Sequence, residues 1–124
     1  MGTQFLAVAI GGAVGSVLRF ATSIGAVRLL GTGFPYGTLL VNIVGCLSAG
    51  FVFGFAEGRT ALSPTIRILL LTGFLGGYTT FSTFMLETAT LAEGATWGGL
   101  AHFFANNAAG ATLAVGGLYL GRLT

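Results

Sequence analysis

The chain carries very little charge. Only 6% of its 124 residues are charged, whereas a soluble domain has about 25%, and 54% are hydrophobic. A soluble fold of this size would have almost no polar surface to present to water. The five basic residues are all arginines spread along the chain, which excludes the clustered basic face that binds nucleic acid. The composition therefore predicts a protein set in a lipid bilayer.

Residues that carry enzyme or metal chemistry are also scarce. The chain has no aspartate, three glutamates, one histidine (His102) and one cysteine (Cys46). A single cysteine excludes an internal disulfide, and this set makes a cluster of metal-ligating side chains within one subunit unexpected. No nucleophile with a base and an orienting group is visible, and no P-loop or dinucleotide motif occurs. We therefore expect no enzyme activity, and we interpret Cys46 as a small hydrophobic residue.

Four long apolar runs are present, separated by short segments that contain turn residues or charge. A helix needs about 20 mostly apolar residues to cross a bilayer, and the runs 4–30, 36–56, 65–92 and 97–120 have that length. Prolines or a charged Glu-Gly pair separate them, which favours helix ends. We expect an all-α membrane protein in which residues 1–124 form one domain of four transmembrane helices. Both termini would then lie on the same side.

Positive charge gives only a weak orientation signal. Arg59, Arg67 and Arg122 belong to the side that holds the termini, and Arg28 belongs to the other, with Arg19 if it reaches that interface. Basic residues near span ends normally set orientation. Because three against two is a small difference, we expect the chain to insert both ways round. Four short helices also enclose little space, so a pore would need a second subunit.

The third run contains the segment GFLGGYTTFSTF, residues 73–84. Each glycine of the Gly76-Gly77 pair weakens a helix by about 1 kcal/mol relative to alanine, and the hydroxyls of Thr79 and Thr80 can satisfy displaced backbone groups. One interpretation is a tolerated kink. The other is a helix broken at mid-membrane, whose freed carbonyls coordinate a cation as in many transporters. Gly76 lies near the middle of the run, where such a site would be.

Several side chains around this segment suit a small anion. Phe81 and Phe84 are spaced i, i+3, so a helix would place them on one face, and their ring edges are electropositive. Packing or lipid contact would explain the same spacing. Asn42, inside the second run, is costly to bury without hydrogen bonds, and it either joins helices or donates to an anion. Ser82 and Thr83 add hydroxyl donors.

Other polar residues also allow two interpretations. Arg19 either snorkels at a helix end or attracts anions to a pore mouth. Asn106 and Asn107 are adjacent, so at most one is expected to line a path. His102 is expected at the membrane interface rather than as a ligand. Glu87 is the best candidate for a proton-coupled carboxylate, although its place near the end of the run favours a structural role.

Three motifs occur in order along the chain, namely GGAVGSVLRF (11–20), GTLLVNIVGCLSAG (37–50) and GFLGGYTTFSTF (73–84). Together they closely resemble the Fluc/CrcB family of fluoride channels, over essentially the whole chain. The resemblance implies passive fluoride efflux across the bacterial inner membrane. It also implies a dual-topology homodimer, in which one subunit is inverted against the other, with two fluoride pathways and a structural sodium ion at the centre.

The resemblance also implies roles for individual residues. The backbone carbonyls of Gly76 and Thr79 would hold the sodium ion, and Arg19 would lie at the pore vestibule. The fourth run matches the family less well, so only one of its residues is carried over. The implied fluoride pathway comprises Asn42, Phe81, Phe84, Ser82, Thr83, Thr38 and Asn107.

Two other functions remain open from the sequence. A small dual-topology multidrug exporter has a similar size and composition, but that class relies on a carboxylate in its first span, where this chain has no acid. A non-transporting membrane subunit would explain the many glycines but not the polar third run.

Overall fold

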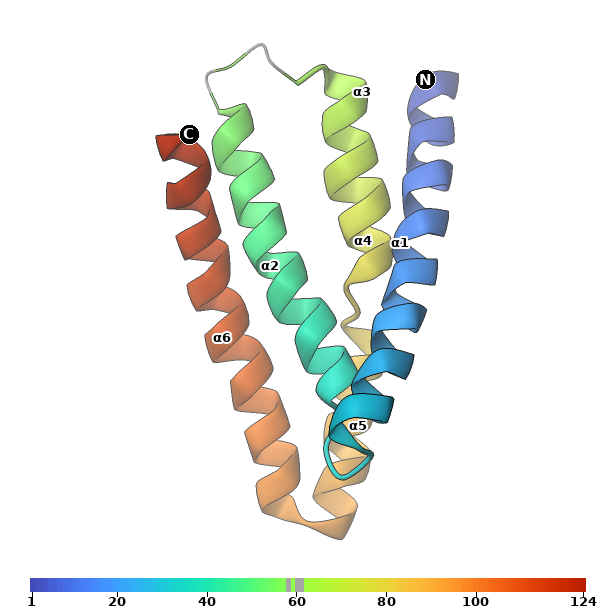
Figure 1. The fold of residues 1–124 in the computed structure, drawn as a ribbon, viewed down its shortest axis with the longest axis vertical. Helices are drawn as coiled ribbons and strands as arrows, with labels where there is room; N and C mark the ends of the chain where they lie inside the picture. Colours follow the sequence, from blue (N-terminus) through green and yellow to red (C-terminus); the bar gives the residue numbers. More distant parts are fainter. Residues whose placement is uncertain (58, 60–61) are drawn as a thin grey trace.

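The computed structural model describes residues 1–57, 59 and 62–124, and in these residues it is all-helical, with no strand. All four predicted runs are helical, and the third consists of several pieces. The elements shown in Figure 1 are α1 (Gly2–Leu30), α2 (Tyr36–Ala56), α3 (Pro64–Arg67), the π-helical η1 (Ile68–Leu75), α4 (Gly76–Tyr78), α5 (Ser82–Gly94) and α6 (Thr96–Leu123).

Three stretches are long and apolar enough to cross a membrane, namely α1, α2 and Pro64–Gly94. Helix α6 has 28 residues, which is sufficient length for a crossing, yet it is not among the three. Helix α6 carries the polar residues His102, Asn106 and Asn107 within its length. The fourth helix is therefore present as predicted, but it does not have the apolar character that was expected of a fourth span.

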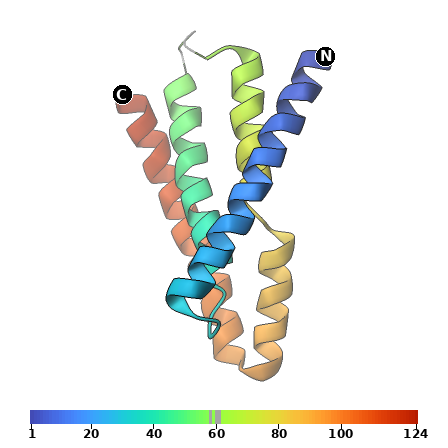
Figure 2. The same ribbon diagram turned by 45° about the vertical axis from the view of Figure 1, so that its right-hand side comes forward.

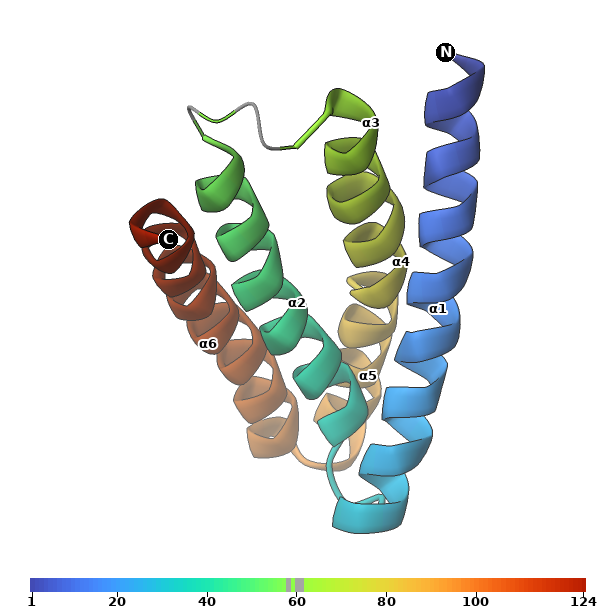
Figure 3. The same ribbon diagram turned by 45° about the horizontal axis from the view of Figure 1, so that its top comes forward.

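The helices associate in two groups. Helix α2 packs mainly against α6, and α1 packs mainly against η1 and α4. Figures 1 and 3 show both termini at one end of the molecule, with the α1–α2 and α5–α6 turns at the other end. This arrangement is the one that four antiparallel crossings produce.

Glycines allow both groups to pack with their backbones in contact. A Cβ atom at Gly117 of α6 would overlap the carbonyl oxygen of Leu47, and one at Gly15 of α1 would overlap that of Phe74. Lipid tails are as apolar as the side chains, so van der Waals contact between closely approaching helices provides much of the attraction. The same close approach occurs at Gly11, Gly50, Gly54 and Gly121.

An ion pair joins the ends of α2 and α6. The Arg122 guanidinium donates from Nη2 to Oε1 of Glu57 at 3.1 Å, and from Nε to Oε2. These hydrogen bonds hold the pKa of Glu57 below its usual range. Both side chains are exposed, so the pair aligns the two helix ends without adding much stability.

The third run is broken at Thr79–Phe81, at the later end of the predicted segment. Gly76 itself is helical, with φ −63° and ψ −36°, whereas Thr79 has an extended ψ of 161°. Figure 2 shows α5 displaced sideways from α4 after this point. The preceding π-helical turns of η1 are of a kind often found at functional sites. The prediction of a broken helix is therefore right, but the break does not begin at Gly76.

Candidate functional site

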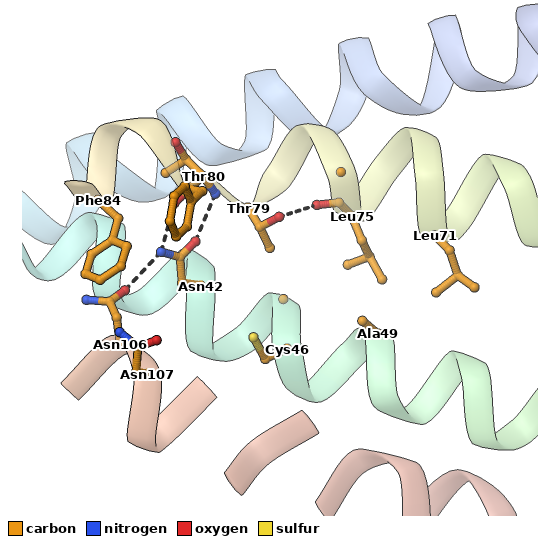
Figure 4. A pocket seen from close by; sticks show the side chains of 13 residues that line it. Asn42, Cys46, Ala49, Leu71, Leu75, Thr79, Thr80, Phe84, Asn106 and Asn107 are labelled. Atoms are coloured by element: carbon orange, nitrogen blue, oxygen red, sulfur yellow. Dashed lines mark hydrogen bonds between the residues drawn. The ribbon is translucent and has the colours of Figure 1, made fainter. Parts of the chain in front are cut away.

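A cavity of about 370 Å³ lies beside the break, between α2, α4 and α6 (Figure 4). Leu71, Leu75 and Ala49 lie toward one end of it, and the polar side chains gather at the other end. No acidic or basic side chain of the described residues lines it. Of the residues predicted to form the site, it brings together Asn42, Gly76, Thr79, Phe81, Phe84 and Asn107.

The side chain of Asn42 is bonded to the broken backbone. The Thr80 N–H donates to Asn42 Oδ1 at 2.9 Å, and Asn42 Nδ2 donates to the Thr80 carbonyl at 3.0 Å. The same Nδ2 also donates to Oδ1 of Asn106 at 2.9 Å. A break exposes backbone groups that lipid cannot satisfy, and Asn42 satisfies two of them. Both hydrogens of its amide are consequently in use.

The hydrogen bonds continue from Asn106 to Glu87 in the middle of α5. Asn106 Nδ2 lies 3.1 Å from His102 Nδ1 and also donates to the His102 carbonyl at 2.9 Å. His102 Nε2 lies 3.2 Å from Oε2 of Glu87. The Thr38 hydroxyl donates to the other oxygen, Oε1, at 3.0 Å. Glu87 thus has hydrogen-bond partners on two helices, α2 and α6.

His102 is completely buried, with 0% of its surface exposed. Its ring packs nearly at right angles to Phe34, with 5.3 Å between the centroids, and edge-on to Phe84 at 5.2 Å. His102 therefore does not face outward from the bundle, and the prediction that it lies at the depth of the membrane interface stays a prediction. The residue is near the start of α6, but its side chain points into the helix bundle, where Glu87 and Asn106 bind both ring nitrogens.

A second, smaller cavity of about 180 Å³ lies near the α1–α2 connection. Thr38 and Glu87 line this cavity together with Ser23 and Thr32. The hydrogen-bonded network therefore extends from one cavity to the other, with His102 buried between them. Thr38 belongs to the smaller cavity and does not line the larger one with Asn42.

Phe81 and Phe84 both line the larger cavity but differ in exposure. Phe81 precedes the first residue of α5 and is 74% exposed, whereas Phe84 is only 3% exposed. Their centroids are 5.9 Å apart with the rings tilted by 70°, so the two side chains contact each other as the i, i+3 spacing predicts. Such tilted pairs direct a ring edge at a neighbouring face.

The remaining pathway candidates are less closely connected to the cavity. Ser82 and Thr83 are exposed at the start of α5 and do not line it. Asn107 lines it, but its amide donates to the Phe103 carbonyl at 2.8 Å. Asn106 lines it too, so the expectation that at most one of the two asparagines does is wrong. The i, i+4 spacing of His102 and Asn106 was the sequence signal for a shared face.

The remaining groups predicted to act at the break are the Arg19 side chain and the backbone carbonyls of Gly76 and Thr79. Nη1 of Arg19 donates to the Thr79 carbonyl at 3.2 Å, and no hydrogen bond to the Gly76 carbonyl is found within the described residues. Freed carbonyls are the ligands that sodium takes in broken-helix transporters; the Gly76 carbonyl matches that description, whereas the Thr79 carbonyl already accepts from Arg19. The described part of the chain contains no cluster of three His, Cys, Asp or Glu side chains that would hold a metal otherwise.

Comparison with known proteins gives consistent matches over most of the chain. Residues 6–118 match the family model described as CrcB-like protein, Camphor Resistance (CrcB). A protein of Maridesulfovibrio salexigens named fluoride-specific ion channel FluC is 44% identical over 121 residues, which cover 97% of this chain and 96% of that protein. Proteins of the same name from Roseiflexus sp. and Desulforapulum autotrophicum are 47% identical over 76% of each chain and 38% identical over 97% of each chain.

Proposed function

The chain belongs to the CrcB-like family, and on that basis we propose that it is a fluoride-specific ion channel that lets fluoride leave the cell passively. It is a multi-pass membrane protein, with three stretches that are apolar enough to span a bilayer. One observation of this chain carries the proposal. The Asn42 amide and the rings of Phe81 and Phe84 converge on one cavity that no charged side chain lines.

The cavity suits fluoride because it replaces water with donors that are weak enough to release the ion. A pore must substitute for the hydration shell, and passage also requires that binding be moderate. Amide hydrogens and ring edges offer partial positive charge, whereas an arginine inside the cavity would hold the anion too strongly. Arg19 lies outside it and is bonded to the Thr79 carbonyl, where its charge raises the local anion concentration.

Entry of fluoride requires an exchange of acceptors at Asn42. Its two amide hydrogens are bonded to the Thr80 carbonyl and to Oδ1 of Asn106. An ion therefore binds there by replacing one of these oxygens. The Asn106 oxygen is the one that gives way, because the Thr80 carbonyl belongs to the backbone of the break. The exchange keeps both hydrogens of Asn42 paired, and it costs about 1–3 kcal/mol because the displaced Asn106 oxygen loses its donor.

The driving force comes from outside the protein. Hydrogen fluoride is a weak acid that enters cells uncharged and dissociates inside. An inside-negative potential then drives the anion outward, with about 2.3 kcal/mol per charge for each 100 mV. The channel therefore needs neither an ATP site nor a proton relay.

A second, inverted copy of the chain completes the channel. In the single chain the cavity is open at the side where Gly76 and Phe81 are exposed, and four helices alone enclose too little for a pore. A twofold axis beside the break would bring the Gly76 and Thr79 carbonyls of both copies together as sodium ligands. A bound cation would offset the negative ends of these carbonyls and stabilise the dimer as a structural ion.

Ion efflux from liposomes that contain the purified protein tests this function. We expect rapid release of fluoride, measured with a fluoride electrode, and no release of chloride under the same gradient. Sodium should not accompany fluoride in a fixed ratio, because the cation is structural. Proton-dependent movement of an organic cation without fluoride release would instead identify an exporter and sink the proposal.

A further inference from the structure

The hydrogen-bonded network between the two cavities runs through Thr80, Asn42, Asn106, His102 and Glu87. Which atom donates at each step can be worked out, because the backbone groups in contact with it act only as donors or only as acceptors. The Thr80 N–H can only donate, so the atom of Asn42 that meets it at 2.9 Å must be the side-chain oxygen. The nitrogen of Asn42 then faces Asn106 at 2.9 Å and donates to its oxygen. The break in the third run thereby sets the orientation of both amides.

The orientation of Asn106 is fixed a second time from its own helix. The His102 carbonyl can only accept, and Asn106 Nδ2 lies 2.9 Å from it. The same nitrogen lies 3.1 Å from His102 Nδ1, so a donor faces this ring nitrogen. Nδ1 must accept and carries no hydrogen, because two donors would otherwise oppose each other. The hydrogen of the neutral ring is then on Nε2, which donates to Glu87 Oε2 at 3.2 Å.

We propose that Asn106 and His102 are positioning residues that hold the Glu87 carboxylate away from the anion cavity, with His102 fixed as the neutral Nε2–H tautomer. The proposal rests on the fluoride channel function, since an unpaired carboxylate near the path would repel the ion. Four donors point the same way, from Thr80 through Asn42 and Asn106 to His102 and the carboxylate. Aligned hydrogen bonds of this kind strengthen one another.

Within the part of the chain that the structure describes, no further side chain competes for the ring nitrogens of His102. Glu87 on α5 is the one charged group that contacts it among the described residues. Phe34 of the α1–α2 connection and Phe84 of α5 cover the ring with aromatic edges and faces. A ring that is 0% exposed has no water to supply a different hydrogen-bond pattern. The tautomer is therefore set by Asn106 alone on the Nδ1 side.

The hydrogen-bonded network from Thr80 to Glu87 also links ion binding to Glu87. Fluoride that displaces the Asn106 oxygen from Asn42 removes the bond that joins the break to α6. Asn106 remains tied to His102 through two contacts of its own, so the tautomer and the position of Glu87 persist while the ion passes. The carboxylate thus stays paired in both states of the site.

Nitrogen NMR of the single histidine tests the proposal directly. His102 is the chain's one histidine, so protein labelled with ¹⁵N-histidine and reconstituted in lipid reports this ring alone. We expect a neutral ring with its hydrogen on Nε2 at neutral pH. The variant Asn106→Asp keeps the side-chain size but places an acceptor against Nδ1, and its spectrum should show a hydrogen on Nδ1. The matched control is Asn107→Asp, whose side chain is bonded to Phe103 instead and should leave the ring signals unchanged.

A wild-type ring with its hydrogen on Nδ1, or protonated on both nitrogens, would contradict the proposed tautomer of His102. Identical spectra for the two variants would contradict the proposed role of Asn106. Fluoride efflux provides the second measurement. Both variants add a charge at the cavity wall, so we expect Asn106→Asp to lose about tenfold more efflux than Asn107→Asp, a loss of about 1.4 kcal/mol. Equal losses of fluoride efflux in the two variants would show that the network through Asn106 and His102 does not serve transport. A wild-type protein without fluoride efflux would refute the channel function, while the spectra would still decide the tautomer.

Discussion

Phe81 and Phe84 allow transport to be separated from stability at the level of single side chains. Phe81 is 74% exposed on the single chain, so Phe81→Ile should change the unfolding free energy of one subunit's own fold by no more than about 0.5 kcal/mol. Phe84 is 3% exposed, and Phe84→Ala should cost about 3–5 kcal/mol through the cavity that it leaves. We therefore expect Phe81→Ile to abolish fluoride efflux in a protein that melts normally, and Phe84→Ala to lose both properties.

Thermal unfolding in detergent, together with efflux from liposomes, measures the two effects on the same preparations. Size-exclusion chromatography shows whether each variant keeps the oligomeric state of the wild type. Normal efflux by a stable Phe81→Ile variant would remove that ring from the fluoride path.

The residues that the sequence predicted best are those with local signals. Asn42 stands out by its place within an apolar run, Phe81 and Phe84 stand out by their i, i+3 spacing, and all three line the cavity. The joint role of Asn106 and His102 has no such local signal, because it depends on Asn42 and Glu87 of other helices: the Asn42–Asn106 bond joins residues 64 positions apart. Spacing along one helix shows which residues share a face, but it does not show which helix that face will meet.

At the scale of helices, two adjacent glycines of α6 give a matched test of packing. A Cβ atom at Gly117 would overlap the Leu47 carbonyl oxygen of α2, whereas one at Gly116 would meet nothing within 4 Å. Gly117→Ala should therefore force α2 and α6 apart and destabilise the protein by about 1–3 kcal/mol. Gly116→Ala should be neutral or stabilise by up to about 1 kcal/mol, because alanine is the better helix former. Thermal melting of both variants measures this difference in stability, and equal melting temperatures would contradict the close α2–α6 contact.

The break shows where element-level prediction stops. The Gly76-Gly77 pair lowers helix propensity, which predicts a weak point, yet both glycines are helical. The chain leaves the helix at Thr79, next to the residue whose backbone N–H and carbonyl are both bonded to Asn42. Helix propensity therefore predicts the segment that contains the break. The hydrogen bonds of Asn42, from α2, determine where within that segment the helix ends.

At the scale of the whole molecule, the position of Arg19 changes the number of arginines counted at each end, from which the sequence predicts the orientation in the membrane. Arg59 and Arg67 lie in or next to the α2–α3 connection and Arg122 lies in the last turn of α6, at the end that carries the termini, whereas Arg28 lies in the last turn of α1 at the other end. Arg19 is bonded to the Thr79 carbonyl at the break and does not reach that far end. Its charge counts for orientation only during insertion, before the helices pack. Each basic residue near the surface contributes about 1 kcal/mol, so one residue is enough to shift the proportion of the two orientations.

Removal of one or two arginines should therefore convert a protein with two orientations into one with a fixed orientation. We expect labels at the N-terminus of the wild type to be reached from both sides of the membrane. Arg28→Gln should place the termini almost entirely on the cytoplasmic side, and the double variant Arg59→Gln, Arg67→Gln should favour the opposite side. If the channel is an inverted dimer, neither variant alone will release fluoride and their coexpression will restore release, because each supplies the orientation that the other lacks. Full efflux by a variant with a single orientation would show that the channel does not need an inverted partner.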